Sequence, residues 1–584
     1  MSRDLRELLR LMAPYRWRYL GGVAALLLTD LLQLIIPQLL GRVADDLEAG
    51  RLDLAGIGRY AGWIAVTAVA IAGLRWVWRQ LVFGSARRVE YDLRRRLFAH
   101  LQKLTPEFYH RHKTGDLMAL ATNDVQAVRS AAGEGVLMGA DAILLSTATL
   151  VVMLTQVDWR LVLLGLSPLP LLALFALWFG RVMHERHRRV QEVFGDLSEV
   201  VQESAAGIRV VKAFAQEQAQ IDRFTRENRR YQETYLRMAR VHALIDPLIN
   251  LLAGLGFFVI LGYGSTLVLA GRVSLGDLVA FNSYLGMMVW PMLAFGFVIN
   301  IIQRGTAAVR RLREVFQQAP TVADAPDAQP LPQVRGEIEV RDLTFRYRSD
   351  LPPALEGVSF HIRPGETLGI IGRTGSGKST LANLLVRLWD PPQGTVFIDG
   401  KDICTVRLRD LRQAIAYVPQ EAFLFSMTIA ENIAFDAREH SLEEIRAAAA
   451  LAQVDSDIMS FPRGYDTLLG ERGVTLSGGQ RQRVGIARAL MRQAPILILD
   501  DCLSAVDAAT EARLLQELKG IMAGRTTIII SHRVAAVAHA DQILVLDQGR
   551  VVERGRHDEL LERRGLYWQL YQLQQLEAAI AAEA

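Results

Sequence analysis

Long apolar runs dominate the first half of the chain. Each is near or above the ~20 residues that an α-helix needs to cross a ~30 Å hydrocarbon layer. They occupy Trp17–Leu40, Ile57–Phe83, Val136–Val157, Leu161–Phe179, Leu244–Ala270 and Leu278–Ile302. A large soluble protein rarely presents six such runs in series. The pattern predicts an α-helical membrane domain with six crossings over residues 1–316.

The loops between these runs predict topology as well as structure. In residues 84–135 and 181–243, apolar positions recur every three or four residues, which indicates helices that continue past the membrane. Breaks at Leu104–Leu117 and Ala213–Phe224 predict two hairpin tips. Both loops are rich in Arg and Lys, whereas Gly41–Gly56 is acidic. The positive-inside rule therefore places the long loops and both termini in the cytoplasm.

Composition adds three points to this picture. Residues 2–20 are charged and amphipathic, which indicates a helix along the membrane surface and not a cleavable signal peptide. The formal net charge of +4 is spread among many acids, so it reflects topology and does not predict a nucleic-acid partner. The two cysteines, Cys404 and Cys502, both fall in the later half, which favours a reduced compartment without a structural disulfide.

The second half of the chain has a different pattern. A Pro/Ala/Asp-rich stretch at residues 317–333 predicts a linker. From residue 334 to 574, short β-like runs alternate with helical ones, which predicts an α/β domain, and residues 575–584 form a tail. The expected fold class is thus a helical membrane domain followed by an α/β phosphate-binding domain.

A glycine-rich loop carries the clearest chemistry. The apolar run "ETLGIIG" leads into "GRTGSGKST" (Gly372–Thr380) and then into a helical pattern, a complete match to G-x-x-x-x-G-K-[ST] in its required context. The backbone of such a loop wraps nucleotide phosphates, here through Gly372, Thr374, Gly375, Ser376, Gly377, Lys378, Ser379 and Thr380. Lys378 is expected to reach the β- and γ-phosphates, and Ser379 to bind Mg²⁺.

Two further motifs extend this site. The strand-like run "APILILDD" ends in Asp500, which is placed to hold the magnesium through its water shell. A second loop, formed by Ser477, Gly478, Gly479 and Gln480, opens a helix and so creates another phosphate-binding helix N-terminus. The phosphates of one nucleotide do not need two binding loops on the same face of one domain. We therefore expect the second loop to serve a nucleotide bound to another copy of such a domain.

In this order, the motifs resemble the ATP-binding cassette family over nearly the whole chain. Gly372–Thr380 resembles the Walker A motif, Leu476–Gln480 the signature, Ile496–Asp500 Walker B, Ser504–Asp507 the D-loop and Glu471–Gly473 the X-loop of exporters. The resemblance implies that ATP and Mg²⁺ are bound. It also implies that Tyr347 stacks on the adenine, that Gln420 joins Ser379 and Asp500 at the metal, and that Gln420 and His532 serve catalysis.

The layout also narrows the class of transporter. Six crossings followed by a cassette resemble an exporter half-transporter, which implies a dimer whose hairpin tips touch the cassettes. Stretches such as "PEFYHRHKTGDLMALATNDV" resemble one subunit type of the heterodimeric multidrug-resistance-like exporters. A soluble cassette ATPase would lack the crossings, an importer normally has separate halves, and a cassette-gated channel would conduct ions. The expected location is the bacterial inner membrane, with the cassette in the cytoplasm.

Asp501 departs from the family pattern. The family carries a glutamate there, which orients the water that attacks the γ-phosphate; aspartate retracts the carboxylate by about 1.5 Å, and a ~1 Å misplacement can cost on the order of 10²-fold in rate. Because the signature is intact, we expect a heterodimer in which this chain supplies a slow site and completes its partner's fast one. The alternative is a homodimeric lipid or peptide exporter that uses Asp501 as its catalytic base.

The sequence gives only weak evidence on the transported substrate. Met287–Asn300 is rich in Met and aromatic residues, which adapt to varied apolar ligands but also pack against helices or lipid. The family resemblance favours an amphipathic, drug-like substrate. Asp30 and Arg75 lie at similar depths in the first two expected crossings, and we expect them to pair, although each could reach water independently.

Overall fold

The computed structural model describes residues 3–156, 159–435, 439–470, 476–502 and 508–583. They form two compact units: the first contains residues 1–102 and 112–318, and the second contains residues 103–111 and 319–584. The short segment Lys103–Arg111 therefore belongs, by its contacts, with the cassette half of the chain.

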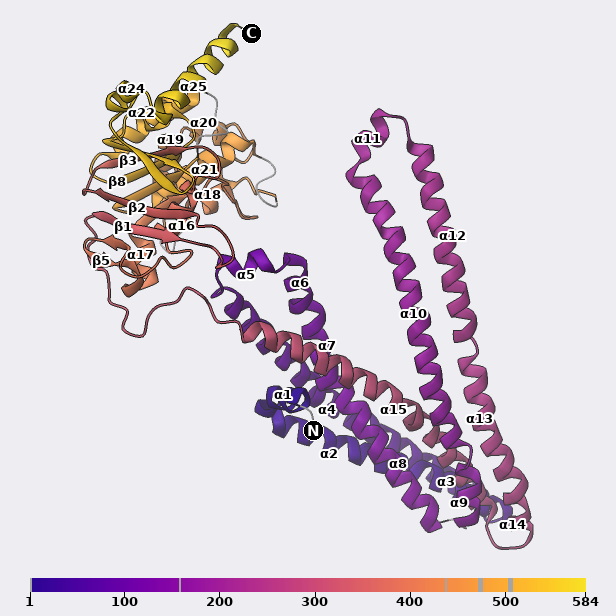
Figure 1. The fold of residues 1–584 in the computed structure, drawn as a ribbon. Helices are drawn as coiled ribbons and strands as arrows, with labels where there is room; N and C mark the ends of the chain where they lie inside the picture. Colours follow the sequence, from indigo (N-terminus) through magenta and orange to yellow (C-terminus); the bar gives the residue numbers. More distant parts are fainter. Residues whose placement is uncertain (1–2, 157–158, 436–438, 471–475, 503–507, 584) are drawn as a thin grey trace. The chain divides into compact units, whose positions relative to one another are not determined.

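The first unit consists of helices (Figure 1). Their bounds are α1 Arg3–Met12, α2 Arg16–Gln33, α3 Ile35–Glu48, α4 Leu54–Leu101, α6 Thr114–Ala119, α7 Val125–Ser130, α8 Val136–Gln156, α9 Trp159–Leu166, α10 Leu169–Ala206, α11 Ile208–Ala213, α12 Glu217–His242, α13 Ile245–Val259, α14 Ser265–Leu269 and α15 Leu275–Phe316. Wider π-type turns at Leu120–Asp124, Ala131–Gly135 and Ile260–Gly264 connect α6 to α7, α7 to α8 and α13 to α14.

The expected crossings can be compared with these helices. Among the described residues, five helical segments are long and apolar enough to cross a membrane: Arg3–Glu48, Leu54–Leu101, Thr114–Gln156, Glu217–Leu269 and Leu275–Phe316. The expected fourth crossing spans α9 and the start of α10, with a turn between them. The Ser167 hydroxyl donates to the Leu164 carbonyl at 2.7 Å, and Pro168 lacks the backbone N–H that a continuous helix would use.

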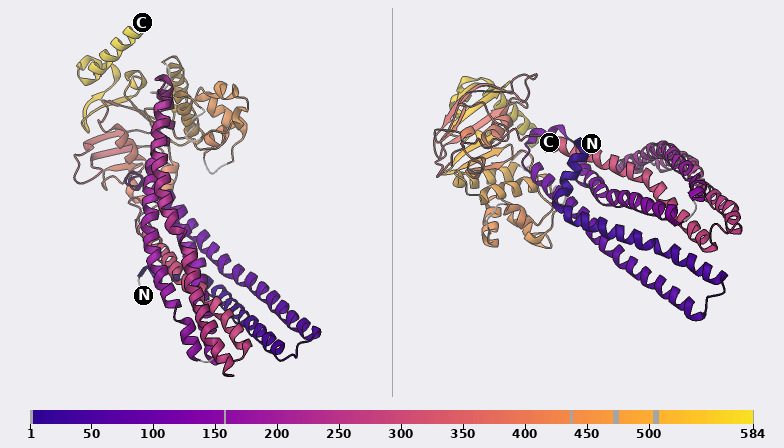
Figure 2. Two further views of the ribbon diagram at one scale, coloured as in Figure 1. Left: turned by 90° about the vertical axis from the view of Figure 1, so that its right-hand side faces the viewer. Right: turned by 90° about the horizontal axis from the view of Figure 1, so that it is seen from below.

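Small residues allow close helix packing in this unit. A Cβ on Gly22 of α2 would come within 2.6 Å of Val82 on α4, and a Cβ on Gly41 of α3 would come within 2.6 Å of the Gly276 carbonyl on α15. Such contacts let backbones approach where no hydrophobic effect drives association. The long helices α10 and α12 run side by side in both views (Figures 1 and 2) and are joined across by ion pairs such as Arg223–Glu203.

Both expected hairpin tips are found. In the first unit α11 turns the chain, and Ala215 adopts a left-handed φ of 51° before α12 begins. The first tip forms α5, Pro106–Arg111, which belongs to the second unit. There Phe108 is buried, and the Thr105 hydroxyl lies 2.6 Å from the Thr321 hydroxyl.

The rest of the second unit is an α/β fold. Its strands are β1 Ile338–Phe345, β2 Leu355–Ile362, β3 Thr367–Gly372, β4 Val396–Ile398, β5 Lys401–Asp402, β6 Ile415–Val418, β7 Ile496–Asp500, β8 Thr526–Ser531, β9 Gln542–Asp547 and β10 Arg550–Gly555. Its remaining helices are α16 Lys378–Leu385, α17 Leu408–Gln413, α18 Ile429–Ile433, α19 Leu442–Leu451, α20 Asp455–Met459, α21 Gly478–Met491, α22 Ala508–Met522, α23 Val534–Val537, α24 His557–Arg563 and α25 Leu566–Glu583.

Two sheets organise these strands. The smaller has the order β2-β1-β4-β5, and the larger has the order β10-β9-β3-β8-β7-β6, in which β9, β3, β8, β7 and β6 are parallel neighbours. β7 and β8 are buried along their whole length, as strands covered on both faces are. One apolar core, which includes Ile338, Leu368 and Ile498, lies between the sheets, and a second covers the other face of the larger sheet.

Candidate functional site

Four adjacent parallel strands end at one edge of the larger sheet, and each leads into an expected site residue. β3 runs into the glycine loop at Gly372, and β7 ends at Asp500. β8 leads to His532, and β6 leads to Gln420. Open α/β sheets bind ligands at the carboxyl ends of their strands. The fold thus gathers residues from four separate parts of the sequence at one edge.

The backbone conformation of the glycine loop, residues 372–380, can be adopted only with glycine at several positions. Gly375 and Gly377 have φ values of 83° and 98°, which disfavour any residue with a Cβ. At Gly377 a Cβ would also lie 2.6 Å from the Ala354 carbonyl, and at Gly372 it would meet the Leu546 carbonyl. This conformation turns the loop, through Thr374 and the buried Ser376, into the N-terminus of α16.

Lys378 lies inside this loop. Its Nζ donates to the carbonyls of Gly372 at 2.8 Å and Arg373 at 2.9 Å. Burial lowers the pKa of the Lys378 ammonium, and the nearby carboxylates of Asp501 and Asp500 oppose that shift. A cation at the mouth of an anion-binding loop and at a helix N-terminus is suited to a phosphate chain.

The expected metal ligands meet beside the loop. The Ser379 hydroxyl donates to Asp500 Oδ1 at 3.1 Å, and the Tyr417 hydroxyl donates to Asp500 Oδ2 at 3.4 Å. Asp500 is buried, and burial raises the pKa of its carboxyl above the ordinary value. Hydroxyl and carboxylate oxygens are the ligands that Mg²⁺ prefers, so this donor set fits that ion. Tyr417 was not expected here; its only sequence signal is its place in "YVPQ", three residues before Gln420.

Asp501 connects three of the strands. Its Oδ1 lies 2.7 Å from His532 Nδ1, and its Oδ2 accepts from Gln420 Nε2 at 3.3 Å. Its backbone N–H donates to the Ile530 carbonyl at 2.8 Å, and its φ is +46°. The three residues expected to serve catalysis therefore form one hydrogen-bonded group.

Tyr347 lies at the other side of the loop. Its hydroxyl donates to Thr380 Oγ1 at 3.0 Å, and its ring meets those of Phe345 and Trp389 edge to face, at centroid distances of 5.1 and 5.3 Å. Tyr347 as a whole is 37% exposed, which leaves room for a planar ligand to approach it. The arrangement is compatible with the adenine-stacking role that the resemblance implies.

The signature residues form a separate feature at the start of α21. The Ser477 side chain caps the helix by accepting from the Gln480 N–H at 3.2 Å, and the Gln480 side chain accepts from the Ser477 N–H at 3.0 Å. Gly478 and Gly479 form the first turn. Among the described residues, none of these four hydrogen-bonds to the glycine loop, and their service to a second nucleotide stays a prediction. The expected X-loop and D-loop lie outside the described residues.

The prediction of a direct ion pair between Asp30 and Arg75 in the membrane unit is wrong. In the described part of the chain Asp30 and Arg75 form no direct ion pair: Arg75 donates to Gln33 Oε1 at 3.0 Å, and Gln33 Nε2 donates to Asp30 Oδ1 at 3.3 Å. Asp30 is fully buried, and Asp141 of α8 lies near it. α2 and α4 place Asp30 and Arg75 at a similar depth. The side chain of Gln33, three residues after Asp30 on α2, bonds to the Arg75 guanidinium in place of Asp30. Met287–Asn300 lies within α15, and its role toward a substrate stays a prediction.

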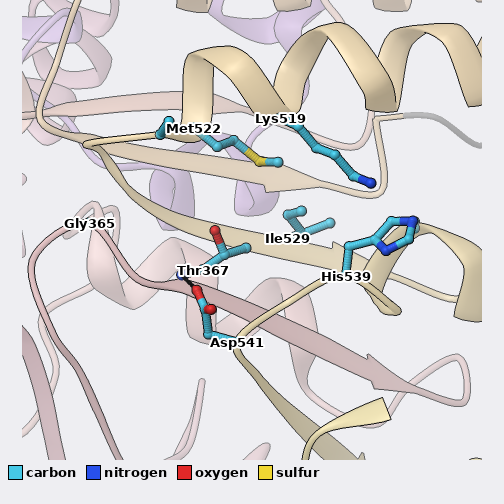
Figure 3. A pocket seen from close by; sticks show the side chains of 9 residues that line it. Gly365, Thr367, Lys519, Met522, Ile529, His539 and Asp541 are labelled. Carbon is cyan, nitrogen blue, oxygen red and sulfur yellow. Dashed lines mark hydrogen bonds between the residues drawn. The ribbon is translucent and has the colours of Figure 1, made fainter. Parts of the chain in front are cut away.

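One cavity lies apart from these residues. A hollow of about 430 Å³, lined by Thr367, Lys519, Met522, His539 and Asp541 among others, opens at the amino end of β3 (Figure 3). Asp541 there accepts from the Thr367 N–H at 2.9 Å. Gly372 and the glycine loop stand at the opposite end of the same strand, so this hollow is not part of the candidate site.

Comparisons with known proteins identify the family of both halves of the chain. Residues 19–292 match the family "ABC transporter transmembrane region", and residues 355–504 match the family "ABC transporter". The "Multidrug resistance-like ATP-binding protein MdlA" of Escherichia coli (strain K12) is 42% identical over 579 residues, which cover 98% of each chain. The "Probable multidrug resistance ABC transporter ATP-binding/permease protein YheI" of Bacillus subtilis (strain 168) is 40% identical and covers 97% of this chain and 96% of its own.

A solved structure extends the likeness to three dimensions. The structure of a bacterial Atm1-family ABC exporter with ATP bound matches with a TM-score of 0.78 and 29% identity, over 96% of this chain and 99% of the other. One solved exporter structure thus covers both halves of the chain. The chain belongs to the ATP-binding cassette transporter family, as an ATP-hydrolysing, multi-pass membrane exporter that carries its membrane and cassette halves on one polypeptide.

Proposed function

We propose that this chain is one half of a heterodimeric exporter of amphipathic, drug-like molecules with two unequal ATP sites. The observation that carries the proposal is the combination of Asp501 after the Walker B strand with an intact signature at Ser477–Gln480. A chain with this combination can complete a fast site on its partner while its own site turns over slowly.

The roles that we assign to the residues are supported by the motifs they resemble and by their positions around the glycine loop. Gly372–Thr380 and Lys378 bind the phosphates, Tyr347 packs on the adenine, and Ser379, Gln420 and Asp500 hold Mg²⁺ directly or through water. Asp501 and His532 then orient the attacking water. One Asp501 carboxylate oxygen bonds to His532 and the other to Gln420. These two bonds hold the short carboxylate close to the ends of the strands.

The signature acts on the other nucleotide. Ser477, Gly478, Gly479 and Gln480 place a helix N-terminus, with its outward N–H groups, against the γ-phosphate held by the partner. The capping box between Ser477 and Gln480 keeps this end of α21 formed before the partner arrives. The basic loops and the resemblance support a bacterial inner-membrane location with cytoplasmic termini and cassette.

The first experiment measures ATP hydrolysis by the chain alone in lipid nanodiscs. We expect weak activity for the wild type and a rise on the order of 10²-fold in Asp501→Glu, because the longer side chain restores reach. Robust wild-type activity that Asp501→Glu leaves unchanged would contradict the unequal-site proposal and favour a homodimer.

The second experiment uses the complex purified from native membranes through a tag on this chain. We expect a different half-transporter with a glutamate at the corresponding position. Ser477→Ala should then reduce ATP hydrolysis by the complex more than Asp501→Ala does, because only Ser477 acts at the fast site. The opposite ranking would contradict the assignment of the two sites.

A further inference from the structure

Three aromatic rings connect the nucleotide loop to α5. The rings of Tyr347 and Trp389 meet edge to face, with centroids 5.3 Å apart and planes at 85°. Trp389 in turn contacts the ring of His110, on α5, at 6.0 Å with planes at 41°. Both separations fall in the range of attractive aromatic pairs. All three residues belong to the second unit.

The Tyr347 end of this path is fixed from several directions. Its hydroxyl is held by Thr380 in the first turn of α16, and Phe345 meets its ring at 82°. With Trp389 on another side, the tilt of the Tyr347 ring is restricted by its neighbours. A planar ligand that packs on Tyr347 must therefore either match this tilt or push against Trp389.

Hydrogen bonds from Arg387 hold the segment that carries Trp389. Arg387 is 2% exposed and has a left-handed φ of 52°. Its guanidinium donates to Asp390 Oδ1 at 2.6 Å, to the Ile403 carbonyl at 3.1 Å and to the Ala323 carbonyl at 3.0 Å. Trp389 lies between Arg387 and Asp390, so its backbone has little freedom to absorb a displacement of its ring.

Contacts with the rest of the second unit also hold α5, at the other end of the three rings. Phe108 is 8% exposed, and the Thr105 hydroxyl lies 2.6 Å from that of Thr321. His110 follows Phe108 in the same short helix, so these two contacts limit how far its backbone can move. A displacement of Trp389 therefore reaches α5 through His110.

We propose that Trp389 is a positioning residue that holds Tyr347 for adenine and transmits adenine binding to α5 through His110. This inference rests on the proposed function, because it takes Tyr347 as the adenine contact. It gives α5 a signal that depends on the base of the nucleotide and not on its phosphates. ATP binding at this chain's own site would then be registered at α5 before, and independently of, the slow hydrolysis at Asp501.

Tryptophan fluorescence of the full chain in nanodiscs tests the first step. A non-hydrolysable ATP analogue should change the emission of the wild type and of Trp568→Phe, a matched control in α25, but not that of Trp389→Phe. Inorganic tripolyphosphate, which lacks the base, should cause no change. A change of equal size in Trp389→Phe would overturn the proposal.

Hydrogen exchange at residues 106–111 tests the second step. The analogue should slow exchange there in the wild type and in Trp568→Ala, and this protection should be lost in Trp389→Ala and restored in Trp389→Phe. Protection that persists in Trp389→Ala would overturn the proposal. The affinity of the analogue for Tyr347→Ala tests the underlying assignment separately: we expect it to fall about tenfold, as loss of a ~1.4 kcal/mol contact does. An unchanged affinity would count against the adenine contact itself.

Discussion

The Oδ1 atom of Asp501 lies 2.7 Å from Nδ1 of His532. The two residues directly follow adjacent parallel strands, β7 and β8, and the Asp501 N–H is bonded back to Ile530 of β8. Two neighbouring strands therefore set the place of a carboxylate that is one methylene shorter than the family's glutamate. His532 Nδ1 lies closer to this carboxylate, at 2.7 Å, than Gln420 Nε2 does, at 3.3 Å.

Removing the charge of Asp501 should lower the residual activity further. In Asp501→Asn the contacts with His532 and Gln420 can persist, but the group can no longer accept a proton from water, and general-base assistance contributes about 10²- to 10⁴-fold. We expect single-turnover hydrolysis by this chain to fall at least tenfold below the wild type, with ATP affinity retained. Unchanged single-turnover rates would show that Asp501 takes no part in the chemistry.

Gly377→Ala should weaken ATP binding through the shape of the loop. The new Cβ would lie 2.6 Å from the Ala354 carbonyl at a φ of 98°, so the loop must shift away from its phosphate-binding form. Gly394→Ala is the matched control, because Gly394 also has a left-handed φ, of 77°, but open space around it. Equilibrium binding of labelled ATP should fall at least tenfold in the first variant and stay near wild type in the second; equal losses would mean that the close approach is unimportant.

The Cys404 thiol should resist alkylation. Burial and the neighbouring Asp402 carboxylate raise its pKa from 9.0 to about 12. Because the thiolate is the nucleophile, the reactive fraction at pH 8 is about 10³-fold lower than for an ordinary thiol, and it increases only as pH rises toward 12. In a Cys502→Ser background, iodoacetamide should label native protein slowly and denatured protein rapidly; rapid native labelling at pH 8 would contradict the raised pKa.

Gln33 should couple to Arg75 more strongly than Asp30 does. Thermal unfolding of the solubilised protein, in double-mutant cycles with Ala substitutions, should give about 0.6 kcal/mol for Gln33 with Arg75, a typical value for hydrogen bonds in membrane bundles. Gln33 with Arg59, which lies in the first turns of α4, is the control and should show no coupling. A larger coupling between Asp30 and Arg75 would favour a direct ion pair.

The features that could be predicted from the sequence are those that depend on residues close together along the chain. The strand, glycine loop and helix from β3 to α16, and the capped start of α21, are predictable because left-handed glycines and a Ser–Gln capping box act within a few residues. The gathering of Gln420, Asp501 and His532 follows from strand order, which the sequence pattern alone does not give; the family resemblance supplied it.

Other features depend on contacts that spacing cannot reveal. Depth along α2 and α4 is a matter of counting residues, but whether Asp30 or Gln33 faces Arg75 depends on helix rotation. Trp389 lies between motifs and carries no sequence signal for its contact with His110, almost three hundred residues earlier. The interruption at Pro168 did have a signal, two prolines in an apolar run, which a hydrophobicity window does not register.

The membership of residues 103–111 in the second unit makes the cassette unit discontinuous in sequence. During synthesis the segment that carries Phe108 leaves the ribosome long before residue 319, so it is in place when the cassette begins to fold. A cassette excised at Ala319 would therefore lack a segment of its own unit, including the buried Phe108. We expect such a fragment to regain solubility when a peptide spanning residues 103–111 is supplied.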